Sequence, residues 1–168
     1  TIADFPFNYV DDSLEVKPGA TLFVPNGSIP KPVAPKVSPR QPARSTFVAG
    51  SGRLSWPIPK RINQYFSWYH GAIDIGAPQG TPIYAAAAGR VIDAKTQNYG
   101  FGIYCIIDIG GMTVAYAHMS SRTCSMGQEV VAGQYLGAVG MTGRATGPHL
   151  HLEVRQGGRA VDPLSLLN

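Results

Sequence analysis

The amino-acid sequence predicts an all-β fold built from short antiparallel strands. Only 14% of the 168 residues are charged, and Gly and Pro occur 20 and 14 times. The apolar residues are rich in Val, Ile, Tyr and Phe, which favour strands over helices. From Gly52 onward, glycines punctuate the chain at intervals of about ten residues, a spacing typical of antiparallel sheet proteins. This length fits one domain of ordinary size with a tail.

Residues 1–26 are too few to bury a core of their own, so we expect a short N-terminal arm. Its turn over residues 16–19 and the apolar run over 21–25 resemble the closing turn and strand of LysM modules, which bind the sugar backbone of peptidoglycan. An ordinary strand-bearing arm explains the same residues equally well. Both alternatives stay open at this point.

Residues 27–50 have the composition of a linker. Repeated prolines alternate with Lys, Arg, Ser and Ala, and the few apolar residues show neither strand nor helix periodicity. Proline stiffens such a segment toward polyproline II, which makes it a semi-rigid spacer. We therefore expect the main domain to occupy residues 51–168.

Within the main domain, strands are predicted at residues 102–109, 112–118, 136–139 and 149–154. Gly110 and Gly111 separate the first two and form a strong signal for a two-residue hairpin. Residues 140–148 are expected to form the loop between the last two of these strands. Residues 85–88 are too few to count as a helix.

The formal net charge of +4 suits an anionic partner, but the basic residues are scattered along the chain without a long run. Charge alone does not distinguish a nucleic acid from an acidic polymer such as a bacterial wall. No stretch approaches the roughly 18 apolar residues of a membrane helix, so no membrane span is expected in this chain.

The four histidines and Asp74 have spacings that suit a metal site. His70 and Asp74 place a nitrogen and an oxygen donor four residues apart. His149 and His151 lie on one face of a predicted strand, because strand side chains alternate. Catalytic zinc sites use three such donors and keep a further position open. A lone histidine is more often a surface residue or a hydrogen-bonded core residue. Here that explanation would have to hold for all four histidines, His118 included, which favours a metal site.

Three segments carry a resemblance to a known family: YHGAIDIGAPQGTPIYAA (residues 69–86), AYAHMS (115–120) and GMTGRATGPHLHLEVR (140–155). They resemble the M23 family of peptidoglycan endopeptidases, and the similarity runs from about residue 56 to 163. The resemblance implies an antiparallel sheet or sandwich of the lysostaphin type, the duplicated hybrid motif. It also implies a narrow groove for an extended peptide over a zinc site, with the loop at residues 140–148 as one wall.

Carried over by position, the resemblance implies that His70, Asp74 and His151 bind one Zn²⁺ per chain. His118 and His149 then stand beside the open coordination position as catalytic residues. Spacing by itself does not decide whether His149 or His151 holds the metal. Zinc polarises the scissile carbonyl and activates water, while the two flanking histidines take up a proton and stabilise the oxyanion. The sequence does not divide these two roles between them.

Two further residues are candidates for supporting roles. Glu153 lies on the same strand face as His151 and can accept a hydrogen bond from a ligand imidazole, although a plain buried or rim carboxylate is as good an explanation. Tyr65 can donate its hydroxyl to the oxyanion, although an aromatic residue at this point more often packs in a core.

Cys105 lies in one predicted strand and Cys124 follows the next, so a disulfide between them is expected. The alternative is a pair of buried free thiols that act as small apolar side chains. Zinc binding by these cysteines is not expected, because they form no closely spaced pair.

The expected function is zinc-dependent hydrolysis of peptide bonds in bacterial peptidoglycan, either in stem-peptide cross-links or in glycine-containing bridges. We expect an extracytoplasmic monomer with no nucleic-acid partner. A non-catalytic wall-binding or regulatory protein on the same scaffold is the main alternative, and intact ligands with both flanking histidines argue against it. A sugar- or nucleic-acid-binding β protein with incidental histidines is a third class, supported only by the N-terminal arm and the positive charge.

Overall fold

A computed structural model describes residues 53–168 of the chain. The arm predicted at residues 1–26, with its LysM resemblance, and the linker predicted at residues 27–50 lie outside the described residues. Their boundaries therefore stay predictions. Within the described part, no helix is long and apolar enough to cross a membrane.

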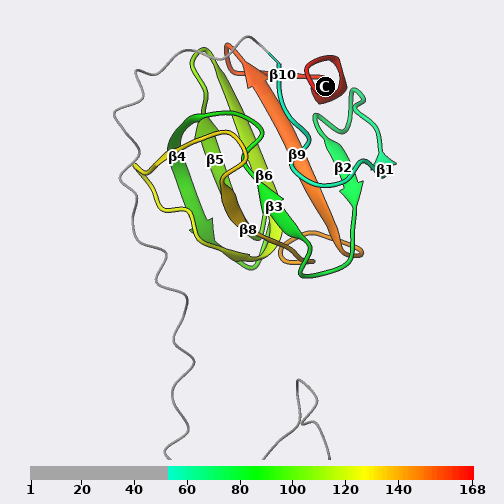
Figure 1. Ribbon diagram of the computed structural model, residues 1–168. Coiled ribbons are helices and arrows are strands. Elements are labelled where there is room, and N and C mark those ends of the chain that lie inside the picture. The colour runs from blue at the N-terminus through cyan, green and yellow to red at the C-terminus, as the bar shows by residue number, and fades with distance from the viewer. Residues whose placement is uncertain (1–52) are drawn as a thin grey trace, which may run out of the picture. The chain divides into compact units, whose positions relative to one another are not determined.

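Residues 53–168 fold into strands joined by turns, with one short 3₁₀ helix near the C-terminus (Figure 1). The elements are β1 (Ile62–Gln64), β2 (Ile73–Gly76), β3 (Pro82–Tyr84), β4 (Gly89–Thr96), β5 (Ile103–Asp108), β6 (Met112–Arg122), β7 (Glu129–Val130), β8 (Tyr135–Val139), β9 (His149–Gln156), β10 (Arg159–Val161) and η2 (Pro163–Ser165). All four predicted strands are confirmed, but β6 continues past its predicted end at His118.

The sheet has the strand order β1-β2-β9-β6-β5-β4-β7, and each of its paired strands is antiparallel to its neighbour. Strand β10 adds to β9, and β8 pairs with the last residues of β6 and carries β3 beside it. The predicted all-β antiparallel fold is thus confirmed. Three strands far apart in sequence, β2, β9 and β6, lie next to one another.

The turn between β5 and β6 has the backbone conformation that its two glycines allow. Gly110 and Gly111 have φ values of 86° and 82°, and positive φ at both central residues defines the type I′ turn that matches strand twist. The amide of Ile109 donates to the carbonyl of Met112 at 2.9 Å and closes the hairpin. The predicted hairpin is confirmed.

Strand β9 separates the core from the surface that carries the histidines. Leu150, Leu152 and Val154 point into the core with 0% exposure, whereas the residues between them face the other side of the sheet. A fully buried aliphatic side chain contributes about 1.5–3 kcal/mol relative to an exposed one, so three of them hold this strand firmly in register.

The second, smaller strand pair closes the core. In Figure 1, β3 and β8 pass in front of β5 and β6, and Ile83 and Leu136 from this pair belong to the same buried cluster as Val114 of β6. Tyr116 of β6 is also fully buried, and its hydroxyl accepts a hydrogen bond of 2.9 Å from the amide of Ala86. This bond satisfies a backbone donor that burial removes from water.

The disulfide expected between Cys105 and Cys124 is not formed in the structure, where both residues are free thiols. They are 0% and 1% exposed, so they pack as small apolar side chains. A hydrogen bond with Cys124, together with burial, raises the pKa of Cys105, which therefore stays a protonated thiol at neutral pH. This corrects the expectation in favour of its alternative, buried free thiols.

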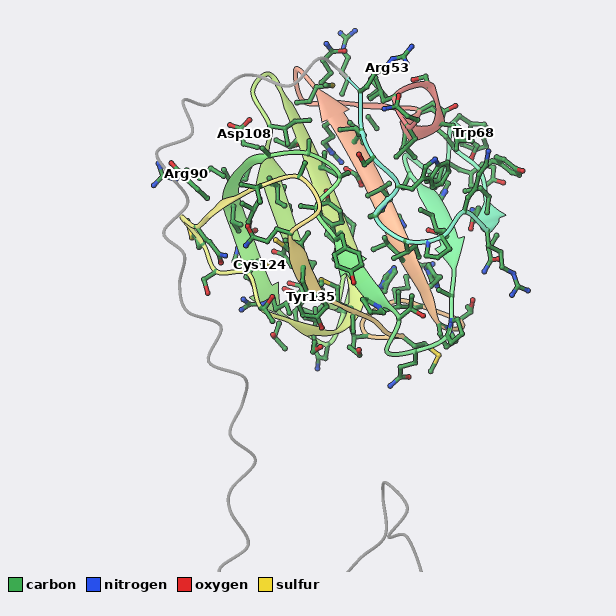
Figure 2. The ribbon with its side chains drawn as sticks, viewed as in Figure 1. Arg53, Trp68, Arg90, Asp108, Cys124 and Tyr135 are labelled. Atoms are coloured by element: carbon green, nitrogen blue, oxygen red, sulfur yellow. The ribbon has the colours of Figure 1, made fainter. Side chains whose placement is uncertain are left out.

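Replacing Tyr116 by Phe leaves the amide of Ala86 buried without an acceptor. We expect the free energy of unfolding in a urea titration to fall by about 1–3 kcal/mol, the usual cost of such a group. Tyr135→Phe is the matched control, because Tyr135, the first residue of β8, is 42% exposed and lies at the surface (Figure 2). Equal stability of the Tyr116→Phe and wild-type proteins would show that this bond contributes nothing.

Candidate metal centre

The three donors predicted for a metal converge on one point. Strand pairing places Asp74 of β2 directly opposite His151 of β9, so both side chains leave the same face of the sheet. His70 reaches this point from the turn before β2. The distance from His151 Nδ1 to Asp74 Oδ1 is 2.9 Å, and that from His70 Nε2 to the same oxygen is 3.3 Å. One ligand atom from each of the three residues lies within 4.8 Å of the others.

This donor set fits a zinc ion. Zinc accepts imidazole nitrogen and carboxylate oxygen at about 2.0–2.2 Å, which places two donors of a tetrahedral site about 3.3 Å apart. The His70 and His151 distances to Asp74 match that separation. The donors also combine two imidazole nitrogens with one carboxylate oxygen, a set that zinc hydrolases use. The residues present therefore fit a single zinc ion.

His70 is oriented by its own loop. Its Nδ1 lies 3.3 Å from the backbone carbonyl of Tyr65, and since a carbonyl oxygen only accepts, this nitrogen carries the proton. The tautomer leaves the lone pair of Nε2 directed toward Asp74. A hydrogen bond behind a metal-binding imidazole commonly sets its tautomer and direction in this way.

Carboxylates stand on both sides of His151. Its Nδ1 contacts Asp74, while its Nε2 lies 3.9 Å from Oε2 of Glu153, a residue that is 9% exposed. Burial disfavours the charged imidazole, but Asp74 and Glu153 outweigh it and raise the pKa of His151 to about 9. Burial likewise opposes ionisation of Glu153, yet His151 and Arg155 lower its pKa, so it stays a carboxylate. Glu153 therefore lies on the side of the His151 ring opposite to Asp74.

His118 reaches the site through a β-bulge. In the β6–β9 register Ala117 pairs with His151, so in a regular strand His118 would point to the opposite face, into the core. The β5–β6 pairing gains one residue on β6 between Tyr116 and Met119, and His118 adopts φ = 59° there. Among residues 53–168 it alone has a positive φ without being glycine. The bulge turns its ring back to the site, 4.9 Å between ring centroids from His149.

Both flanking histidines are held at Nδ1 by a backbone carbonyl. His118 Nδ1 donates to the carbonyl of Thr142 and His149 Nδ1 donates to that of Gly147, each at 2.8 Å. In the neutral imidazole the lone pair is then on Nε2. Burial lowers the pKa of His118, and the nearby His149 and His151 lower it further, which keeps this ring neutral at pH 7.

Thr142 holds the bulge at His118 in place. The sequence did not indicate this residue as part of the site. Its hydroxyl donates to the carbonyl of Met119 at 2.7 Å and accepts from the amide of Ile103 at 2.9 Å, while its carbonyl accepts from His118. These bonds join β5, β6 and the loop at residues 140–148. The TG pair at 142–143 was visible in the sequence, but nothing local connects it to His118.

The site opens into a cavity of about 430 Å³. Its lining residues are Gln64, Tyr69, His70, Asp74, His118, Arg144, Ala145, Thr146, His149 and His151. Three of them belong to the predicted wall loop at residues 140–148. A second hollow of about 420 Å³ shares Asp74, Thr146 and His149, so the recess continues along the sheet edge toward β1.

Tyr65 does not line this cavity. Its side chain is 64% exposed, and its contribution to the site is the backbone carbonyl that orients His70. Tyr69, four residues on, lines the cavity instead. The neighbouring Trp68 is 95% exposed and projects from the β1 side of the domain (Figure 2). An aromatic run such as YFSWYH does not show which ring faces inward, because that depends on the turn.

Comparison with known proteins identifies relatives of this region. The description "Peptidase family M23" matches residues 68–163. The DD-carboxypeptidase/endopeptidase Mpg of Neisseria meningitidis is 42% identical over 117 residues, which are 68% of this chain and 27% of that protein. The chain thus spans about a quarter of the length of this curated relative.

Two solved structures show the same fold. A zinc-containing peptidase from Vibrio cholerae superposes with a TM-score of 0.64 at 30% identity, over 67% of this chain and 39% of that one. The antimicrobial peptidase lysostaphin from Staphylococcus simulans superposes with a TM-score of 0.58 at 29% identity, over 63% of this chain and 48% of that one. The predicted lysostaphin-type fold is confirmed.

The distances favour His151 over His149 as the third metal donor, a choice that spacing left open. His151 lies 2.9 Å from Asp74 Oδ1 whereas His149 Nε2 lies 3.7 Å away, and His149 lacks a carboxylate behind its ring. We expect His151→Ala to reduce bound zinc from about one ion per chain to nearly none, while His149→Ala retains it. Metal content by mass spectrometry, with circular dichroism as the folding control, measures this difference. The reverse result would exchange their roles.

Proposed function

This chain belongs to peptidase family M23, and from that premise we propose that it is an endopeptidase that hydrolyses peptide bonds of bacterial peptidoglycan. The observation that carries the proposal is the arrangement of His118 and His149. Each is oriented by a hydrogen bond from Nδ1 to a backbone carbonyl and lies beside a complete set of three metal donors, within an open cavity. The name of the Neisseria relative, a DD-carboxypeptidase/endopeptidase, supports the same class of reaction.

One Zn²⁺ ion per chain is the cofactor, and His70, Asp74 and His151 are the residues that would hold it. When bound, the ion supplies Lewis-acid chemistry, which polarises a carbonyl group and acidifies water. The chain itself supplies the ligand orientation. The carbonyl of Tyr65 and the carboxylate of Glu153 hold the two imidazoles from behind, so their metal-binding nitrogens are directed before any ion arrives.

His118 and His149 handle the proton in the proposed reaction. One Nε2 accepts a proton from the attacking water as its oxygen bonds to the carbonyl carbon of the scissile peptide. The resulting imidazolium donates to the oxyanion of the tetrahedral intermediate or to the departing amine as the C–N bond breaks. The proton thus returns to the products, and the histidine that carried it regains a free Nε2. A neutral His118 is required at the start, and burial provides it.

The chain has the features that catalysis needs and a regulator would not. A wall-binding or regulatory protein on this scaffold has no need for a strained backbone at His118 or for two imidazoles oriented by backbone carbonyls. We therefore place catalysis first, without a second candidate function. Since the substrate is a wall polymer, the place of action is outside the cytoplasm. We also propose a monomer, because one chain supplies a complete set of three metal donors and both flanking histidines, so the site needs no second copy.

Purified protein should clear a suspension of purified cell walls, and a zinc chelator such as phenanthroline should stop the clearing. His118→Ala should lose cleavage by at least about 100-fold, the typical contribution of a general base, while zinc content stays the same. Turbidity and released amino groups measure cleavage. Zinc-loaded wild-type protein that binds walls without cutting them would instead identify a regulator.

Thr142→Val removes the hydroxyl that bridges β5 and β6 while preserving the shape of the side chain. We expect kcat to fall about 10-fold or more with little change in KM, because His118 loses its position whereas the groove and the metal donors persist. Thr142→Ser keeps the hydroxyl and should retain most of the activity. Loss of zinc, or a change in KM alone, would contradict a role that acts through His118.

A further inference from the structure

Arg144 is a permanent cation in the wall of the metal cavity. It is the sole Lys or Arg among the residues that line this cavity, and its side chain is exposed. Among the ion pairs within residues 53–168, none involves Arg144. The mechanism above does not use it.

The backbone around Arg144 is held in place relative to His118. The amide of Arg144 donates to the carbonyl of Gly100 at 2.8 Å, and the preceding Gly143 packs so tightly on that turn that a Cβ atom would collide with the same carbonyl oxygen. Thr142, one residue earlier, accepts the hydrogen bond from His118. The backbone of Arg144 is therefore held at a fixed position relative to His118. Only the side-chain torsions of Arg144 remain free to place its guanidinium.

No carboxylate of the site is available to neutralise Arg144. Asp74 is the sole acidic residue that lines the cavity, and it belongs to the metal donors. Glu153 pairs with Arg155 and lies behind His151. With zinc bound, the cavity carries the charges of the ion and of Arg144 against the single charge of Asp74. A positive, water-accessible recess favours an anionic ligand.

We propose that Arg144 binds a carboxylate of the substrate peptide. The site would then select stem-peptide cross-links with a free carboxylate beside the cut bond, as a diamino acid or a terminal D-amino acid supplies, over uncharged glycine bridges. The planar guanidinium matches a carboxylate with two parallel hydrogen bonds. This inference rests on the proposed function and specifies its substrate, which the sequence left open between these two classes.

Binding tests the proposal without requiring turnover. The zinc-loaded His118→Ala protein is titrated calorimetrically with two forms of one cross-linked stem peptide, which differ only in a free carboxylate or a carboxamide on the diamino acid. We expect the carboxylate form to bind about 10-fold more tightly, the effect of one charge-assisted contact at an exposed site. Adding Arg144→Gln should abolish this preference, and Arg144→Lys should keep part of it. Arg159→Gln, an exposed residue on β10 outside the cavity, is the matched control and should keep it fully.

Turnover provides the second measurement. With otherwise wild-type protein, Arg144→Gln should raise KM for the carboxylate peptide about 10-fold and leave the carboxamide peptide unchanged, with similar kcat for both. Three results would overturn the proposal. The first is equal binding of the two peptides by the His118→Ala protein that retains Arg144. The others are an equal loss of activity on both peptides in Arg144→Gln, and cutting of pentaglycine as fast as the stem peptide.

The two proposals fail in different ways. A zinc-loaded chain that cuts neither walls nor peptides, yet still prefers the carboxylate through Arg144, would refute the endopeptidase and leave the recognition intact. Normal cutting of walls with no effect of Arg144→Gln would refute only the recognition. Zinc content of Arg144→Gln, expected to equal that of wild type, shows that the site has folded.

Discussion

The pairing of Asp74 with His151 across strands β2 and β9 is the interaction on which the rest of the site depends. Their ligand atoms lie 2.9 Å apart because the two residues are direct partners in the register. A slip of one residue would send His151 into the core and a leucine to the metal. Such a slip is costly, since Leu150 and Leu152 are fully buried on the other face. The hydrophobic core thus positions the metal donors.

In strand β6, a bulge interrupts the regular alternation of side chains and directs His118 into the site. His118 leaves the core face through a bulge whose left-handed backbone costs of order 1–3 kcal/mol for a non-glycine residue. The hydrogen bonds of Thr142 to Met119, Ile103 and His118 hold this conformation. The loop at residues 140–148 therefore does more than shape the groove. It also positions the imidazole of His118, and it carries Arg144 two residues after Thr142.

The two ring nitrogens of His151 face different carboxylates, Asp74 at Nδ1 and Glu153 at Nε2. Asp74 on the cavity side belongs to the metal, whereas Glu153 behind the ring is tied to Arg155 and shielded from the groove. With Asp74 assigned to zinc, the cavity offers positive charge to its ligand. This local charge, more than the scattered net charge of +4, is what suits the site to an anionic peptide.

Local sequence patterns determined much of this protein by themselves. Strand-forming residues, period-2 alternation and the Gly110-Gly111 turn predict β5, β6, β8 and β9, because hairpins and strand faces follow from near neighbours. Strand β4 and the short strands β1, β2, β3, β7 and β10 were not placed. The short strands have only two to four residues, which carry too little periodicity. The grouping of His70, Asp74 and His151 rested on the family resemblance, and the structure brings the three together.

The tertiary structure alone decided the features that depend on pairing between distant segments. It directed His118 into the site, connected Thr142 to it, put Tyr69 rather than Tyr65 in the cavity wall, and kept Cys105 and Cys124 as free buried thiols. Strand register and packing set each of these features. They determine the bulge at His118, the packing of the loop at residues 140–148 on the turn at Gly100, and which aromatic ring of residues 65–70 faces the cavity. These are properties of strands that meet only after the chain has folded, so no local pattern records them.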